Sequence, residues 1–370
     1  MATSVLNPNQ IVRPEIDTNE VIKLTETIFG LQVLRYSELN SYDDRNFHIH
    51  VEKTENKNIS KISSEGYVLK VLNSLDSEYD AAIEAQNTLI IYLNDNGINT
   101  PKPMKTVVNE TKSIQILGSG KKHIVRLFEY LPGRILAGIP YTREITFQTG
   151  QLAGKLDKHC QNFNHPGFGN HRRIWSLTEV PKLVEFLSYT EDLGVQTLCK
   201  EVINTFTNNV VANYHTLQKG LIHGDFNEQN IIVNQTGSAY HVSGLLDFGD
   251  AADSYYIFEV AIAMCYMMLE STILDPMKAG GYTLAGYLSE FPLNEVDLNV
   301  LKECICARLV QSLIIGTYST AMHPENSSYF QISSKKAWKM LITMWNTPKE
   351  QMNEIWKECL VEFGVKFSWE

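Results

Sequence analysis

The sequence predicts an α+β fold in two lobes, a small antiparallel-sheet lobe with one helix followed by a larger, mainly helical lobe. Two observations predict it. Strand-like runs dominate the first third of the chain, whereas amphipathic helical periodicity dominates the rest. Between these parts lies a Leu-Pro-Gly break at 131–133, where the chain is expected to pass from one lobe to the other.

The first lobe is built from strand-like runs separated by polar stretches rich in Ser, Asp and Asn. We expect strands at 33–39, 47–53, 67–72, 105–108, 113–117 and 123–130. One helix is expected at 77–94, because Asn96-Gly97 and the prolines beyond it form a helix stop. Residues 1–20 contain two prolines and little periodicity, which predicts a flexible N-terminal arm. The small lobe then spans 21–127.

The second lobe is expected at 135–370, after a hinge at 128–134. Amphipathic windows predict helices at 144–161, 177–189, 196–217, 256–271, 294–318 and 334–363. A short β-rich patch between 221 and 247 interrupts them.

Composition restricts the partners. The chain has 370 residues, 44% of them hydrophobic, which is enough for two cores. Its 42 acidic and 32 basic residues give a formal net charge of -10 without a basic block, so nucleic acid is not an expected partner. No apolar run approaches the ~20 residues of a membrane span, and the six cysteines form no CxxC pair. We expect no membrane contact and reduced thiols in the cytoplasm, and we make no prediction of oligomeric state.

The most informative motif is His223-Gly224-Asp225-Phe226-Asn227-Glu228-Gln229-Asn230, followed by the apolar strand 231–233. Asp225 and Asn230 have the spacing of a kinase catalytic loop, in which the aspartate accepts the proton of the attacking hydroxyl and the asparagine binds a metal ion. We therefore assign Asp225 as the catalytic residue and Asn230 as a metal ligand.

A second carboxylate follows at the end of an apolar strand, in Leu245-Leu246-Asp247-Phe248-Gly249-Asp250. The intervening 234–238 contains a glycine turn, so a hairpin is expected to return Asp247 toward Asn230. Carboxylate and amide oxygens suit a hard cation such as Mg²⁺. The alternative is that Asp225, Asn230 and Asp247 are ordinary turn residues.

Nucleotide binding requires a cation on the phosphates, and Lys70 is the candidate. It lies in the strand Tyr67-Val68-Leu69-Lys70-Val71, where alternation places Val68 on the same face, against the base. The alternative is a solvated strand lysine. An acid of the following helix should hold Lys70, and of Glu78, Asp80 and Glu84 we favour Glu84, which lies within the apolar body of that helix.

The loop that should cover the phosphates is 41–46, and it contains no glycine. Phosphate contacts are therefore expected from backbone N–H groups, assisted by Ser41 or Arg45. Glu129 and Leu131, in the expected hinge, complete the nucleotide-binding residues.

With HGDxxxxN and DFGD motifs in this order, the chain resembles the aminoglycoside phosphotransferase and choline kinase-like superfamily over residues ~20 to ~340. The resemblance extends to Phe128-Glu129-Tyr130-Leu131-Pro132-Gly133 and His165-Pro166-Gly167-Phe168, and it implies a protein-kinase-like fold. Protein kinases fit less well. Gly224 stands where they have arginine, and the apolar helix from Ile257 leaves no room for an activation loop, so a small-molecule acceptor is favoured.

Within the superfamily the chain looks most like the hydroxylysine kinases, through SYDDRNFHI, YVLKVLN, HGDFNEQNIIV and LLDFGDA. That resemblance implies transfer of the γ-phosphoryl group of GTP (or ATP), with Mg²⁺, to the side-chain hydroxyl of 5-hydroxy-L-lysine, a step of lysine catabolism. Homoserine, choline, methylthioribose and aminoglycosides remain alternative acceptors. A nucleotide-binding pseudokinase and a protein kinase are the alternatives from other classes.

An amino-acid substrate with two ammonium groups calls for acids or aromatic faces. The residues close behind the metal strand that could supply them are Asp250, Asp253, Tyr256 and Glu259. Each has a structural alternative; an acid at the start of a helix, as at Glu259, is favoured by the helix dipole alone.

Overall fold

The computed structural model describes residues 10–118, 120–170, 173–322 and 327–366. The chain divides into two compact units, and the main division, between Gly133 and Arg134, falls within the segment expected to be a hinge. Unit 1 comprises Met1–Gly133, His165–His171 and Gly244–Gly249, and unit 2 comprises Arg134–Asn164, Arg172–Ser243 and Asp250–Glu370.

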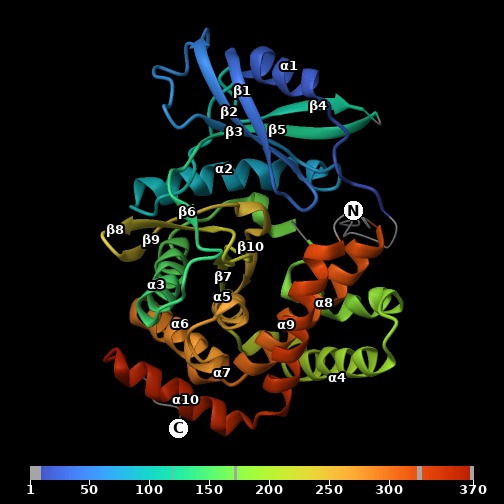
Figure 1. The fold of residues 1–370 in the computed structure, drawn as a ribbon, viewed down its shortest axis with the longest axis vertical. Helices are drawn as coiled ribbons and strands as arrows, with labels where there is room; N and C mark the ends of the chain where they lie inside the picture. The colour runs from blue at the N-terminus through green and yellow to red at the C-terminus, as the bar shows by residue number, and fades with distance from the viewer. Residues whose placement is uncertain (1–9, 119, 171–172, 323–326, 367–370) are drawn as a thin grey trace. The chain divides into compact units, whose positions relative to one another are not determined.

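Unit 1 is built on a five-stranded antiparallel sheet with the strand order β1-β2-β3-β5-β4. Its strands are β1 (Leu31–Leu39), β2 (Arg45–Thr54), β3 (Tyr67–Val71), β4 (Ser113–Leu117) and β5 (Lys121–Glu129). Two helices, α1 (Thr18–Phe29) and α2 (Asp80–Asp95), lie on opposite faces of this sheet (Figure 1).

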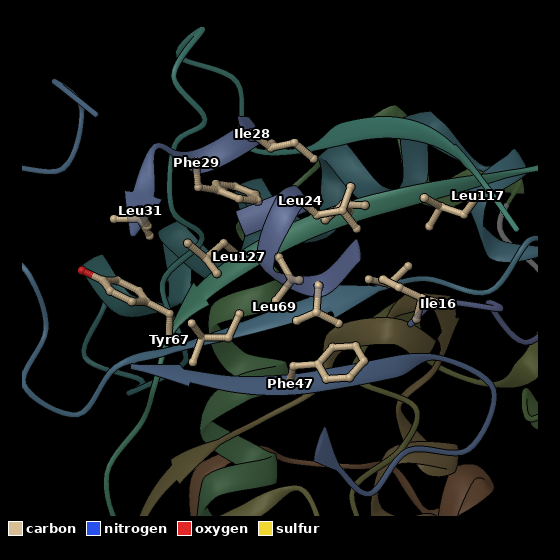
Figure 2. Packing of buried hydrophobic residues seen from close by; sticks show 14 of the residues in the cluster. Ile16, Leu24, Ile28, Phe29, Leu31, Phe47, Tyr67, Leu69, Leu117 and Leu127 are labelled. Atoms are coloured by element: carbon tan, nitrogen blue, oxygen red, sulfur yellow. The ribbon is translucent and has the colours of Figure 1, made fainter. Parts of the chain in front are cut away.

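One face of the sheet carries the apolar core of unit 1. Leu24, Ile28 and Phe29 of α1 pack on alternate residues of the central strands, including Leu69 and Leu127, as Figure 2 shows. Because side chains alternate along a strand, Val68 and Lys70 point to the opposite face. The register places Lys70 between Asn46 and Arg126, so this second face is polar where α2 covers it.

Unit 2 is mainly helical. Its α-helices are α3 (Arg143–Cys160), α4 (Leu193–Asn209), α5 (Tyr256–Glu270), α6 (Pro276–Glu290), α7 (Glu295–Leu298), α8 (Leu301–Met322), α9 (Ser327–Asn346) and α10 (Lys349–Glu362). Its strands are β6 (Arg134–Ile135), β7 (Lys219–Ile222), β8 (Ile231–Thr236), β9 (Ala239–Leu245, whose end belongs to unit 1) and β10 (Ala252–Tyr255). A long 3₁₀ segment covers Leu177–Tyr189. The predicted hairpin is present as β8 and β9, and Gly237 in its turn has φ +62°.

Helix α5 is almost completely buried and forms the centre of unit 2. Helices α3 and α6 cross very closely (Figure 1). A Cβ added at Gly150 of α3 would lie 1.9 Å from the backbone oxygen of Thr283, and one at Gly286 of α6 equally close to that of Phe147. Glycine is therefore required on both helices at this crossing.

The predicted α+β architecture is confirmed, but the first part of unit 1 differs from expectation. Helix α1 was not predicted, although Asp17 and Glu20 form a reciprocal capping box at its start. The flexible arm was expected over residues 1–20. Residues 1–9 lie outside the described ones, and in the remainder Val12 and Ile16 are buried, so that expectation is wrong there.

Two further element predictions are wrong. Residues 105–108 form a turn rather than a strand, closed by the Thr106 N–H bond to the Glu110 carbonyl oxygen, and Val108 is exposed. The turn overrides the strand propensity of the two valines. Helix α6 was missed because Gly280, Gly281 and Gly286 weaken its intrinsic helix preference, and close packing compensates for them.

No helix within the described residues is long and apolar enough to cross a membrane. All six cysteines are buried free thiols.

Candidate functional site

The HGD motif lies where β7 ends and the chain turns toward β8. Gly224 has φ +78°, a conformation that L side chains rarely adopt. A Cβ at this position would also come within 2.8 Å of the Asp250 backbone oxygen. Glycine is therefore required next to Asp225, which explains why the arginine of protein kinases is absent here.

Both carboxylate oxygens of Asp225 are held. Asn230 donates from Nδ2 to Oδ2 at 2.8 Å and to the Asp225 backbone oxygen at 3.0 Å. Arg308 donates from Nη2 to Oδ1 at 2.7 Å. The Asp225 side chain nevertheless remains 22% exposed. Its carboxylate is thus fixed in direction but still open to a ligand.

Arg308 is the residue that sequence reasoning missed. It lies on α8, 1% exposed, and donates to the Trp175 backbone oxygen at 2.8 Å and to Gln311 Oε1 at 3.0 Å. Its guanidinium lies over the rings of Trp175 and Tyr266, at 5.2 and 5.3 Å from their centroids. A basic residue inside the apolar run Cys306-Ala307-Arg308-Leu309-Val310 was the available signal, because a buried arginine requires partners.

Two residues proposed to contact substrate have structural positions instead. Glu259 is fully buried, and its Oε2 accepts the backbone N–H of Gly224 at 2.8 Å. Burial raises the pKa of Glu259, against the lowering effect of His223. Tyr256 is also buried, against Phe291 at 4.7 Å between ring centroids. Direct substrate contact was therefore the wrong expectation for both, and Glu259 instead holds the loop that contains Gly224.

The other two candidates differ from each other. Asp250 forms an ion pair with Arg173, with 3.2 Å between Oδ1 and Nε, and its side chain is only 13% exposed. Asp253 lies on β10 and is exposed. Of the four proposed substrate residues, only Asp253 is therefore open to solvent.

In unit 1, Lys70 is held between two carboxylates. Its Nζ lies 2.8 Å from Asp247 Oδ1 and 3.3 Å from Asp44 Oδ2, and its side chain is 10% exposed. Burial alone lowers the pKa of Lys70, but Asp247 and Asp44 outweigh it and raise the pKa above its ordinary value. Lys70 is therefore a buried ammonium group held by two carboxylates.

Asp247 has φ +52°, one of two non-glycine residues with positive φ in the described part of the chain. Its Oδ1 also accepts the Gly249 N–H at 3.1 Å, and its side chain is 42% exposed. Unusual backbone angles are concentrated at functional sites, because the surrounding structure must hold them in place.

The expected ion pair between Lys70 and Glu84 is wrong. Glu84 Oε2 lies 3.1 Å from Nζ of Lys112, near the start of β4. Helix α2 instead turns Gln86 toward the polar face of the sheet, where Gln86 Oε1 accepts from Arg126 Nη1 at 3.2 Å. Because helix residues two apart point in different directions, Glu84 does not share the direction of Gln86.

The other residues assigned to the nucleotide differ in their contacts and exposure. Ser41 Oγ donates to the Asp44 backbone oxygen at 2.6 Å, and Arg45 is paired with Glu38. Val68 is half-buried in β3, opposite Phe128. The remaining two differ in exposure, since Glu129 is exposed and Leu131 is half-buried.

The proposed metal ligands offer oxygen atoms. Asn230 directs its amide nitrogen at Asp225, so its side-chain oxygen is not used in those bonds. Asp247 supplies a half-exposed carboxylate. Within the described residues, no three His, Cys, Asp or Glu side chains form a metal-binding group. Taken singly, each of these two residues offers an oxygen ligand of the kind that a hard cation such as Mg²⁺ prefers.

Comparisons with known proteins identify the family of this chain. A family model described as "Phosphotransferase enzyme family" matches residues 37–291. Hydroxylysine kinase of Xenopus laevis is 36% identical over 368 residues, covering 96% of each chain. Hydroxylysine kinase of Bos taurus is 36% identical over 362 residues, covering 94% of each.

Solved structures establish the fold. A microcompartment-associated aminopropanol kinase superposes with a TM-score of 0.67 at 14% identity, covering 89% of this chain and 98% of its own. An amicoumacin kinase, solved with AMP-PNP and Ca²⁺, gives a TM-score of 0.64 at 15% identity, covering 87% and 93%. The predicted kinase-like fold is confirmed, and the chain, a small-molecule phosphotransferase acting on a hydroxyl group, belongs to the phosphotransferase enzyme family.

Proposed function

We propose that this chain transfers the γ-phosphoryl group of GTP, or of ATP, to the side-chain hydroxyl of 5-hydroxy-L-lysine. The observation that carries the proposal is the clamped catalytic aspartate, because both oxygens of Asp225 are directed by named donors while the side chain stays open to a ligand. The acceptor rests on the likeness to hydroxylysine kinases over nearly the whole chain. Another small hydroxylated metabolite is the alternative acceptor.

In this mechanism Asp225 orients the acceptor hydroxyl and takes its proton. Phosphoryl transfer has a loose transition state, so positioning matters more than strong activation of the nucleophile. A carboxylate that accepts bonds from Arg308 and Asn230 suits that task, since its direction is fixed before the substrate arrives. Removal of Asp225 should therefore reduce turnover far more than nucleotide affinity.

Lys70 is the cation for the nucleotide phosphates in this proposal, and 128–134 is the hinge between the units. Asn230 and Asp247 would hold Mg²⁺, which supplies neutralisation of the charge that develops on the phosphoryl oxygens. The GTP preference comes from the resemblance to hydroxylysine kinases. The six free buried thiols suit a reducing compartment, which supports the expected cytoplasmic location.

The test is a coupled assay of nucleoside-diphosphate release with Mg²⁺. GTP and ATP are each combined with 5-hydroxylysine, lysine, homoserine and choline, and Asp225→Asn serves as the blank. We expect turnover with 5-hydroxylysine but not with lysine, and none in the blank. Turnover with homoserine or choline alone would replace the acceptor, and nucleotide binding without any turnover would favour the pseudokinase.

A further inference from the structure

We propose that Asp44, in the loop between β1 and β2, is the positioning residue for Lys70, in the place that a helix glutamate was expected to take. The inference rests on the proposed function, because it assigns to Lys70 the task of binding nucleotide phosphates. It concerns residues of unit 1 alone, and it gives a role to a residue of the motif SYDDRNFHI to which the sequence analysis assigned none.

The Asp44 side chain is buried and held by hydrogen bonds. It is 8% exposed, and its Oδ1 accepts two bonds from Asn73, from the backbone N–H at 2.8 Å and from Nδ2 at 2.9 Å. Asn73 is itself bonded to Asp76 by two further hydrogen bonds. The other oxygen of Asp44 is directed at Lys70 Nζ, 3.3 Å away.

The two carboxylates beside Lys70 are not equivalent. The side chain of Asp247 is 42% exposed and that of Asp44 is 10% exposed. Asp247 is also the proposed metal ligand, and a divalent cation on its carboxylate would compete with Lys70 for it. Asp44 has no such second task and is fastened to Asn73, so it is the partner suited to hold Lys70 when nucleotide is bound.

This arrangement ties the lysine to the loop expected over the phosphates. Ser41 Oγ closes the loop on the Asp44 backbone oxygen at 2.6 Å, and the Asp44 side chain continues to Lys70. Glu84 is paired with Lys112 instead. A single residue, Asp44, is therefore connected to both the loop, through its backbone oxygen, and Lys70, through its carboxylate.

The experiment measures binding of Mg²⁺ with a non-hydrolysable GTP or ATP analogue to the full chain by calorimetry, without acceptor. The variants are Asp44→Asn, Asp44→Glu and, as the matched control, Glu84→Gln. Loss of a charge-assisted partner predicts about 10- to 100-fold weaker nucleotide affinity in Asp44→Asn. We expect partial recovery in Asp44→Glu, no more than about a twofold change in Glu84→Gln, and an unchanged KM for the acceptor.

A double-mutant cycle separates this role from a general loss of folding. If Asp44 acts through Lys70, Asp44→Asn should weaken affinity no further in a Lys70→Met background. Wild-type affinity in Asp44→Asn, an equal loss in Glu84→Gln, or additive losses in the cycle would each overturn the inference. Nucleotide binding without any turnover in the parent protein would defeat the proposed activity but leave the role of Asp44 standing, whereas no nucleotide binding at all would defeat both.

Discussion

Replacing Arg308 by methionine should slow phosphoryl transfer while leaving nucleotide affinity unchanged. The substitution removes the 2.7 Å bond to Asp225 Oδ1, which is charge-assisted on both sides. Bonds to charged groups contribute about 1.5–3 kcal/mol. Because 1.36 kcal/mol corresponds to a factor of ten in rate, the expected loss in kcat is about 10- to 150-fold if the bond is needed in the transition state.

The same change should also lower stability, since it leaves the Trp175 carbonyl and Gln311 without their buried donor. Removing one partner of a buried ion pair costs about 3–5 kcal/mol, and the lower end applies because Asp225 remains 22% exposed. For a unit of this size, 1 kcal/mol moves Tm by about 2–4 °C. A fall in Tm on the order of 6–12 °C is therefore expected.

The assay is steady-state kinetics with the folded fraction checked by thermal melting, and Arg143→Met as the control. Arg143 makes the same kind of ion pair, with Glu144, but is 58% exposed, so its loss should change neither kcat nor Tm measurably. Added guanidinium ion should partly restore kcat in Arg308→Ala. A folded Arg308→Met enzyme with more than half of the parent kcat would show that the bond from Arg308 to Asp225 is not needed in the transition state.

Three further predictions follow from the site and its support. Glu259→Ala should lower kcat by about tenfold or more, because the Gly224 N–H loses its hydrogen-bond acceptor. Glu259→Gln should have a kcat closer to that of the parent in the same assay. Equal kcat values in the parent and both variants would exclude a role of Glu259 in holding the loop. Gly286→Ala should lower Tm, because the added Cβ would lie 1.9 Å from the Phe147 backbone oxygen. Gly169→Ala should leave Tm unchanged, because the added Cβ would have no neighbour within 4 Å. An unchanged Tm in both variants would contradict the close crossing of α3 and α6. Burial raises the pKa of Asp157, which lies beside Tyr287, so its carboxyl group stays protonated to higher pH in the folded state than in the unfolded chain. The free energy of unfolding should therefore fall as pH rises above about 4, the ordinary pKa of an aspartate. Asp157→Asn should therefore lose less Tm than the parent between pH 5 and pH 8, and equal losses would contradict the assignment.

The catalytic loop and β3 can be predicted from the sequence because their signals are local. The Asp225 to Asn230 spacing, the apolar strand behind it and the alternation around Lys70 each lie within a few residues. Turn chemistry adds the β8–β9 hairpin, because a glycine between two apolar runs favours it. In the structure Asn230 donates to Asp225 and Lys70 is paired with Asp247, and the catalytic roles of these residues stay predictions.

The partners of these residues cannot be predicted in the same way. Arg308 is 83 positions from Asp225, and only the packing of α8 in unit 2 brings it to the catalytic loop. Glu84 was assigned to Lys70 from its position on the helix alone, and that prediction is wrong. In the structure Glu84 forms its ion pair with Lys112. Long-range ion pairs depend on how elements pack, and local patterns do not carry that information.

Helix α6 and residues 105–108 show the same limit for secondary structure. Three glycines argue against a helix at α6, yet close packing against α3 requires glycine there. Two adjacent valines argue for a strand at 105–108, yet the Thr106 turn overrides them. In both cases tertiary contacts outweigh local propensity.

In the proposed reaction, Asp225, with both carboxylate oxygens held by hydrogen bonds, directs phosphate to the side-chain hydroxyl of an amino acid. The most direct measurement is ³¹P NMR of the product formed from Mg²⁺, GTP and 5-hydroxylysine. We expect a phosphate ester on the side-chain hydroxyl, absent with lysine and absent with Asp225→Asn. Formation of the same ester at the parent rate by Asp225→Asn would contradict this role of Asp225. Nucleotide consumption with another acceptor, without any ester of 5-hydroxylysine, would contradict the proposed acceptor.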